Sequence, residues 1–205
     1  MSRLREGLAR YLAPEALARL AAVHVGIAGA GGLGSNVAVM LVRSGIRRLM
    51  TADFDRVEAS NLNRQAFFPE DLGRPKVEAL RELLFRLEPE LEYRGHDLRL
   101  TPENAPALFA GCDVVVEAVD GAETKAALCS ALLRAGFFVV AASGLAGWGG
   151  PPMRARRVGA NLILVGDEAD DVSDQAPPMA PRVTQAAALQ ADTVLEYVLG
   201  GVEKY

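Results

Sequence analysis

Residues 23–43 of this 205-residue chain read VHVGIAGAGGLGSNVAVMLVR, and this stretch decides the fold. Its first part, 23–28, is a short apolar run with β-branched residues, which is typical of a buried strand. A glycine cluster at 29–34 follows directly, and apolar residues between Leu33 and Val42 then recur at helical spacing. A strand, a tight turn and a helix in this order predict the first unit of a doubly wound α/β sheet.

The glycine cluster matches the spacing G-x-G-x-x-G at Gly29, Gly31 and Gly34, and Gly32 adds a fourth glycine. Such glycines permit a tight turn and let the backbone approach a phosphate at a helix N-terminus. The pattern alone does not distinguish a phosphate-binding loop from a structural one, because glycines also permit close packing of a helix on a sheet. Asp53 follows Gly34 by 19 residues, at the end of the next predicted strand. A carboxylate there can accept hydrogen bonds from ribose hydroxyls, so the context favours nucleotide binding.

The rest of the chain continues the alternation of strands and helices. Strands are predicted at 46–52, 91–93, 114–119 and 137–142, and helices at 75–88, 102–109 and 122–135. Two short helices are predicted around Pro14, a hairpin at 153–165 with its turn at Gly159, and a last helix at about 183–199. We therefore expect one α/β domain with a doubly wound, mainly parallel sheet, short N-terminal helices, and a C-terminal hairpin plus helix.

Composition and charge exclude several classes of protein. The chain has 22 Lys and Arg against 26 Asp and Glu, so its formal charge of −4 offers no basic field for nucleic acid or anionic lipid. Glycines interrupt the two long uncharged segments, 20–42 and 135–153, which therefore do not predict membrane-spanning helices. The start of the chain has no apolar stretch typical of a secretory signal. We expect a cytoplasmic protein.

The chain has two cysteines, Cys112 and Cys129, which are too few for a disulfide framework or a four-thiolate zinc site. Neither belongs to a CxxC pair, and both occur in apolar surroundings that predict buried, inert thiols. His24 and His96 have no second histidine or carboxylate at metal-ligand spacing. We therefore predict no zinc site.

Further polar residues follow the predicted strand ends. The loop after 46–52 contains Asp55 and the sequence SNLNRQ at 60–65, and Lys76 lies in the first turn of the next predicted helix. A cation there opposes the helix macrodipole at a cost of roughly a few tenths of a kcal/mol, and such a local misfit often marks function. A solvated surface lysine is the alternative. Asp120, at the end of 114–119, either caps the following helix or faces the ligand crevice.

Four motifs occur in a fixed order: GAGGLGSN at 29–36, DFDRVEASNLNRQ at 53–65, GRPKVEAL at 73–80, and Val119-Asp120. In this order they resemble the ThiF/MoeB/HesA superfamily of ubiquitin-activating-like adenylyltransferases. The resemblance covers residues 23 to about 145 and is greatest to the short, thiamine-branch adenylyltransferases of sulfur carriers. It implies the Rossmann-like adenylation fold of ubiquitin-activating enzymes.

The resemblance also implies a reaction and the residues that perform it. The carboxylate of a carrier's C-terminal glycine attacks the α-phosphate of ATP, in the presence of Mg²⁺, to give an acyl-adenylate and pyrophosphate. Arg64, Lys76 and Asp120 would be catalytic, with Asp120 binding Mg²⁺. The nucleotide-binding residues would be Gly29, Gly31, Gly32, Gly34, Asp53 (on the ribose), Asp55, Asn61, Arg64 and Lys76. A carboxylate that approaches a triphosphate needs fixed cations and a metal, which agrees with these roles.

The implied partner is a small ubiquitin-like sulfur carrier that ends in Gly-Gly, used in thiamine thiazole biosynthesis. A homodimer is implied, in which an arginine near the N-terminus would reach the partner subunit. Arg3, Arg5 and Arg10 are the candidates, but the second half of the family's RYxRQ pattern is absent after Arg10-Tyr11, which favours a solvated helix face for these arginines. No nucleic-acid or membrane partner is expected. Within a single adenylation domain, 1–205, residues 1–22 would be a helical lead-in, 23–145 the nucleotide-binding core, and 146–205 the carrier-binding hairpin, crossover loop and terminal helix.

The chain departs from the family pattern at the C-terminal side. No cysteine follows Cys129, so we expect the reaction to stop at adenylation. Trp148, in a glycine-rich stretch, is a candidate gate for the carrier's thin tail. Two other functions remain open: an NAD-dependent oxidoreductase, which shares the glycine loop and Asp53, and a non-catalytic nucleotide-binding interaction module.

Overall fold

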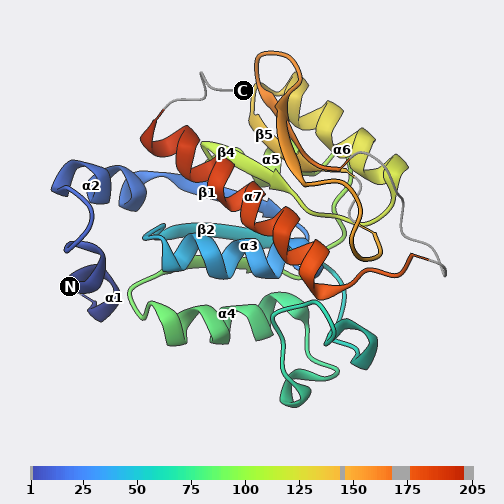
Figure 1. Cartoon of the computed structure of the whole chain (residues 1–205), viewed down its shortest axis with the longest axis horizontal. Coiled ribbons are helices and arrows are strands. Elements are labelled where there is room, and N and C mark those ends of the chain that lie inside the picture. Colours follow the sequence, from blue (N-terminus) through green and yellow to red (C-terminus); the bar gives the residue numbers. More distant parts are fainter. Residues whose placement is uncertain (1, 144–145, 168–175, 201–205) are drawn as a thin grey trace.

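The computed structural model of the chain describes residues 2–143, 146–167 and 176–200. One seven-stranded sheet runs through the molecule in the order β3-β2-β1-β4-β5-β7-β6 (Figure 1). The strands are β1 (His24–Ala28), β2 (Arg48–Ala52), β3 (Glu92–His96), β4 (Val114–Glu117), β5 (Phe138–Ala142), β6 (Arg154–Arg157) and β7 (Leu162–Gly166). All neighbouring strands are parallel except β6 and β7. The predicted mainly parallel sheet is therefore confirmed.

Helices cover both faces of the sheet. They are α1 (Arg3–Leu8), α2 (Pro14–Ala22), α3 (Gly32–Arg43), α4 (Lys76–Leu87), α5 (Ala105–Leu108), α6 (Ala122–Arg134) and α7 (Ala180–Leu199). Helices α3, α4 and α7 pack on one face, and α5 and α6 on the other (Figure 1). This two-sided cover confirms the doubly wound architecture. The two predicted N-terminal helices and the predicted terminal helix are also present.

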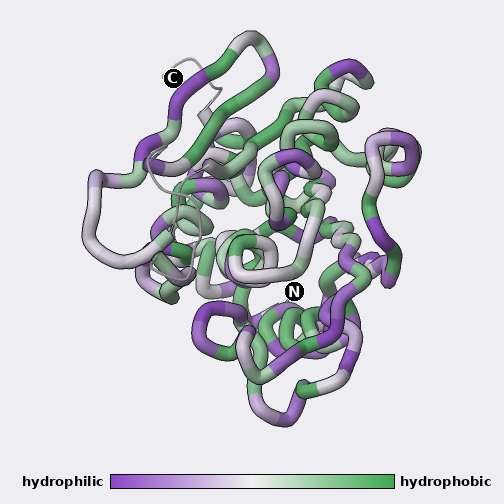
Figure 2. The backbone as a smooth tube through the Cα atoms, turned by 90° about the vertical axis from the view of Figure 1, so that its right-hand side faces the viewer, coloured by the Kyte–Doolittle hydropathy of each residue, from purple (hydrophilic) through white to green (hydrophobic). Residues whose placement is uncertain are grey.

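Two apolar clusters, one on each face, hold these layers together. Leu41 of α3, Leu80 of α4 and Val183 of α7 are almost fully buried in the first cluster, and Leu128 of α6 is buried in the second. The central strands β1, β4 and β5 are buried along their whole length. Hydrophobic and hydrophilic stretches alternate along the chain (Figure 2). Each buried leucine side chain contributes about 1.5–3 kcal/mol, so the sheet and its helices form one rigid support for the loops.

Helix α4 shows how the sequence sets an element. Pro75 is the N-cap residue, Val77, Leu80 and Leu84 recur at helical spacing and are buried, and the helix ends before Pro89. The predicted bounds are accurate here because the period and both stop signals agree.

Two elements differ from the prediction. Strand β3 extends to His96 because it pairs along its whole length with β2, although its sequence EYRGH is too polar to predict a buried strand. Helix α5 is a single turn at 105–108 and shorter than predicted. The hairpin is confirmed, and β7 also pairs in parallel with β5, which joins the hairpin to the main sheet. Within the described residues, no helix has the length and apolar character needed to cross a membrane.

Candidate nucleotide-binding site

A pocket of about 290 Å³ opens at the carboxyl ends of β1, β2 and β4. This is the point where the strand order reverses, and ligands of doubly wound sheets bind there. Six residues predicted from the sequence line this pocket: Gly29, Gly31, Asp53, Asp55, Lys76 and Asp120. The fold therefore brings together residues from four separate parts of the chain.

The glycine loop lies between β1 and α3 in close contact with its surroundings. Gly29 has φ of 103°, and a Cβ atom there would lie 2.6 Å from the carbonyl oxygen of Ala118. A Cβ on Gly34 would lie 1.9 Å from the carbonyl oxygen of Gly29. No side chain of the described residues caps the N-terminus of α3, so its first N–H groups are free to bind an anion.

Asp53 connects the end of β2 to the glycine loop. Its Oδ2 atom accepts a hydrogen bond from the N–H of Ala30 at 2.6 Å, and its Oδ1 atom accepts one from the N–H of Asp55 at 2.8 Å. Burial raises the pKa of Asp53, while both N–H groups act in the opposite direction. Each carboxylate oxygen can accept a further hydrogen bond, so Asp53 can serve the loop and a ribose together.

Lys76 is the first residue of α4 and is only 4% exposed. Its Nζ atom lies 2.7 Å from the Oδ2 atom of Asp55, which is more exposed. The alternative of a solvated surface lysine is therefore wrong. The structure holds a cation in the pocket wall, with a single carboxylate beside it among the described residues.

Asp120 is exposed at the pocket, two residues before α6 begins. The N-cap residue of α6 is Gly121, with φ of 80°, and the helix has no side-chain cap. The capping interpretation of Asp120 is therefore wrong. Among the described residues, no hydrogen bond or ion pair involves its carboxylate. An exposed carboxylate at a ligand pocket suits Mg²⁺, which is held in proteins by one or two carboxylates and by substrate phosphates.

Arg64 and Asn61 do not line the pocket. The Nη1 atom of Arg64 donates to the carbonyl oxygen of Ser60 and to Oδ1 of Asn63, both at 2.9 Å. Asn61 accepts a hydrogen bond from the N–H of Glu58 at 3.1 Å. A Cβ on Gly32 would lie 3.4 Å from the Cγ atom of Arg64, so the stem of Arg64 borders the glycine loop while its guanidinium is bonded to Ser60 and Asn63.

A buried ion pair supports the strand end that leads to Asp120. Glu117, the last residue of β4, is fully buried, and Lys125 of α6 places Nζ 2.8 and 3.0 Å from its two carboxylate oxygens. Glu117 also accepts a hydrogen bond from the N–H of Val119 at 2.8 Å. Burial raises the pKa of Glu117, and Lys125 opposes this shift. Sequence reasoning missed this pair, although a glutamate inside the apolar run VVVEAV was a visible signal.

Phe54 and Arg99 form a second feature that sequence reasoning missed. The guanidinium carbon of Arg99 lies 4.0 Å from the centroid of the Phe54 ring, and both residues line the pocket. Neither the period nor the spacing of the sequence predicts this contact, because Arg99 lies in an irregular connection between β3 and α5.

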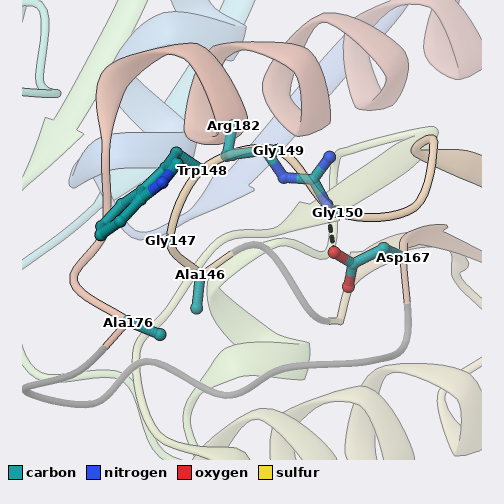
Figure 3. Close-up of a pocket in the computed structure, with 8 residues that line it drawn as sticks. All are labelled: Ala146, Gly147, Trp148, Gly149, Gly150, Asp167, Ala176 and Arg182. Atoms are coloured by element: carbon teal, nitrogen blue, oxygen red, sulfur yellow. Dashed lines mark hydrogen bonds and ion pairs between the residues drawn. The ribbon is translucent and has the colours of Figure 1, made fainter.

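A second cavity, of about 160 Å³, lies between the glycine-rich segment 146–150 and the first turn of α7 (Figure 3). Arg182 and Asp167 form a buried ion pair at this cavity, and Arg182 also donates to the carbonyl oxygen of Pro151 at 2.8 Å. Trp148 lies at the rim and is 73% exposed. Its role as a gate stays a prediction, and most of the predicted crossover loop, 168–175, lies outside the described residues.

Both thiols and the His24 imidazole are shielded from solvent by the fold. Burial raises the pKa of Cys112 and of Cys129 to about 12. His24 is buried with Nδ1 2.8 Å from the carbonyl oxygen of Gly111, and burial lowers its pKa. Within the part of the chain that the structure describes, no group of three His, Cys, Asp or Glu residues has the geometry of a metal site.

The parallel sheet, the glycine loop and the acidic residue at the end of β2 are the features of the doubly wound folds that bind nucleotides. Comparison with known proteins identifies the family of the chain. The chain belongs to the ThiF family, whose model matches residues 4–204.

Curated relatives include two named enzymes. A sulfur carrier protein adenylyltransferase from Thermus thermophilus is 38% identical over 122 residues, which are 59% of this chain and 45% of the relative. A tRNA threonylcarbamoyladenosine dehydratase from Haemophilus influenzae is 35% identical over 143 residues, which are 69% of this chain and 55% of the relative. The chain thus spans about half the length of these two relatives.

The fold has a counterpart among solved structures. The Escherichia coli tRNA N6-threonylcarbamoyladenosine dehydratase in complex with ATP superposes with a TM-score of 0.86 at 22% identity. The match covers 95% of this chain and 93% of that chain. It confirms the adenylation fold of the family.

Proposed function

We propose that this protein is an ATP-dependent adenylyltransferase that activates a carboxylate as an acyl-adenylate. The observation that carries the proposal is the nearly fully buried Lys76, in the wall of a pocket that it shares with the glycine loop, Asp53 and Asp120. A buried cation is costly unless it meets a negative charge, and among the described residues Asp55 is the carboxylate that forms an ion pair with it. A dinucleotide oxidoreductase has no evident use for this lysine.

The reaction follows from the arrangement. The triphosphate lies against the N-terminus of α3 and Lys76, and Asp53 accepts hydrogen bonds from the ribose. The incoming carboxylate oxygen forms a bond to the α-phosphorus while the bond to the β-phosphate bridging oxygen breaks. The electron pair leaves with pyrophosphate, and no proton is transferred. The fixed charges of the pocket stabilise the negative charge that gathers on the α-phosphate.

Asp120, with the phosphates, would hold Mg²⁺, which neutralises phosphate charge when it is bound. Arg64 stays in the proposal as a phosphate ligand that must turn from its present partners, the loop carbonyl of Ser60 and the side chain of Asn63. Asn61 also stays in the proposal as a phosphate ligand, and its side chain must likewise leave its hydrogen bond with the N–H of Glu58.

The carboxylate that we propose is the C-terminal glycine of a small ubiquitin-like sulfur carrier, in a homodimeric, cytoplasmic enzyme of thiamine thiazole synthesis. The name of the Thermus thermophilus relative supports such a carrier. The glycine-rich wall of the second cavity also supports it, because a narrow Gly-Gly tail fits between such backbones.

The second candidate substrate is the threonylcarbamoyl carboxylate of a modified tRNA. The Haemophilus influenzae relative, a tRNA threonylcarbamoyladenosine dehydratase, aligns over a larger share of this chain than the carrier enzyme does. The net charge of −4 disfavours this substrate, because a tRNA is a large polyanion.

Exchange of labelled pyrophosphate into ATP tests the function and separates the two substrates. We expect exchange to depend on a carrier ending in Gly-Gly, with no stimulation by tRNA that contains threonylcarbamoyladenosine. Lys76→Ala should lower exchange about 10²-fold or more, the scale of one lost electrostatic stabiliser. Arg86→Ala, which removes an exposed cation at the other end of α4, is the matched control. Exchange near the wild-type rate in folded Lys76→Ala would contradict the proposal.

A further inference from the structure

Phe54 and Arg99 are two large side chains that contact one another at the pocket. Phe54 follows β2 and is 45% exposed, and Arg99 follows β3 and is also exposed. The guanidinium lies over the ring at 4.0 Å from its centroid. Holding two exposed side chains in one geometry costs conformational entropy with little burial in return. A contact of this kind at a ligand pocket is expected where the two side chains bind or position the ligand.

The pocket lining contains two chemical kinds of residue. Asp53, Lys76 and Asp120 are charged, and the glycine loop adds backbone N–H groups. Leu98, Leu100 and Val119 are apolar, and Phe54 and Arg99 add flat side chains. A nucleotide carries its charge at the phosphates and presents flat, apolar ring faces at the base, so the lining has groups suited to both ends.

The sequence neighbour of Asp53 indicates where the base would lie. Asp53 is the residue that would hold the ribose, and Phe54 is its direct neighbour in sequence. With the phosphates on Lys76 and the glycine loop, the base continues from the ribose toward Phe54 and Arg99. The planar guanidinium of arginine stacks on aromatic faces, and one of its faces already covers Phe54.

We infer that Arg99, backed by Phe54, is the residue on which the base of the nucleotide stacks, and that it determines affinity for the base rather than for the phosphates. This inference rests on the proposed function, because it takes ATP as the ligand. It assigns a positioning role to a residue outside the four family motifs of the sequence. A base that stacks on Arg99 fixes the ribose at Asp53 and the α-phosphate at the glycine loop.

The experiment compares ATP with a ligand that has no base. Dissociation constants for ATP and for inorganic tripolyphosphate are measured by titration calorimetry on the full chain and on Arg99→Ala, Arg99→Lys and Phe54→Ala. A matched control exists on α4, where Arg81 lies over Phe85 at 5.2 Å outside the pocket. Arg81→Ala removes a surface cation–π contact of the same kind.

We expect Arg99→Ala to weaken ATP binding roughly three- to thirtyfold, the range of one cation–π contact, and to leave tripolyphosphate binding within about twofold of the wild type. Arg99→Lys should recover only part of the loss, because lysine lacks the planar group. Phe54→Ala should weaken ATP in the same selective way. Arg81→Ala should change neither ligand.

Two outcomes overturn the inference while leaving the proposed function intact. One is ATP binding by folded Arg99→Ala within about twofold of the wild type. The other is an equal loss for ATP and tripolyphosphate, which would make Arg99 a phosphate ligand. If the wild-type chain binds neither compound, the proposed function itself fails, and the inference fails with it.

Discussion

Asp120 lies exposed at the mouth of the nucleotide pocket, and no described residue forms a hydrogen bond or ion pair with its carboxylate. A carboxylate with no structural partner adds little to folding, so its replacement changes function with little change in stability. We expect Asp120→Asn to lower pyrophosphate exchange by about 10²-fold or more and to raise the Mg²⁺ concentration needed for half-maximal exchange. The melting temperature should stay within about 2 °C of the wild type.

The matched control is Glu123→Gln, which removes an exposed carboxylate from the first turn of the same helix. Exchange should then be close to the wild-type rate. Should Asp120→Asn keep its activity and its Mg²⁺ requirement, the assignment of the metal to Asp120 would be wrong.

The residues of the pocket differ in how far the sequence reveals them. The location of Asp53 and Lys76 at the pocket could be predicted from the sequence. Asp53 directly follows a strand and Lys76 begins a helix, so the ends of these elements determine where both residues lie. The direction of the Arg64 side chain could not, because it depends on hydrogen bonds within an irregular loop. The same holds for Arg99, whose contact with Phe54 arises only when the connection after β3 returns to the pocket.

Strand β4 and helix α6 are joined by one ion pair, Glu117 with Lys125. Lys125→Met would leave a fully buried carboxylate without its cation, and we expect the free energy of unfolding at neutral pH to fall by about 3–5 kcal/mol. Glu117 also accepts a hydrogen bond from the N–H of Val119, so the turn that contains Asp120 should become more flexible in this variant. Urea unfolding monitored by circular dichroism measures the loss.

The loss should depend on pH in a defined direction. Burial raises the pKa of Glu117 in the folded chain above the ordinary value of 4.5, and removal of Lys125 raises it further. A group with a raised folded pKa gives its full stability below the unfolded pKa and loses it as the pH rises through the folded pKa. Lys125→Met should therefore be least destabilised at and below about pH 4.5, and its loss of stability should grow as the pH rises above that value.

The double variant Glu117→Gln with Lys125→Met removes both charges and is the control for this prediction. It should recover part of the stability at neutral pH and lose the pH dependence. A penalty for Lys125→Met that is equal at all pH values would show that the effect is packing rather than charge.

Among the elements, those with agreeing local signals were predicted closely, as α4 shows with its two prolines and helical period. Strand β3 was predicted short because an edge strand of polar sequence owes its length to pairing with β2, which is a tertiary effect. The hairpin was predicted from its turn at Gly159, but its parallel pairing with β5 was not, since no local pattern encodes which strand lies beside another.

At the scale of the whole molecule, the sheet order places the pocket. Strands β1 and β4 lie side by side, and the chain leaves them toward helices on opposite faces, α3 and α6. The loops that follow these strands therefore diverge and open a crevice between them. The position of the site therefore follows from the order of the strands, and the sequence predicts it without knowledge of side-chain geometry.

The two thiols of the chain lie away from this crevice, and their chemistry limits the reaction. Cys112 precedes β4, at the end of the strand opposite the pocket, and Cys129 lies within α6. With each pKa raised to about 12, neither forms the thiolate that attacks an acyl-adenylate near neutral pH. Since the chain has only these two cysteines, adenylation is the step at which its own covalent chemistry should end.

We therefore expect the double variant Cys112→Ala, Cys129→Ala to keep pyrophosphate exchange within about twofold of the wild type, because neither thiol contacts the nucleotide pocket. Mass spectrometry of the wild-type chain, incubated with ATP and a Gly-Gly carrier, should detect carrier adenylate and no thioester between carrier and enzyme. A covalent adduct that thiol reagents cleave, and that the double variant fails to form, would contradict this limit and require a movement of α6 or β4 that exposes a thiol to the adenylate.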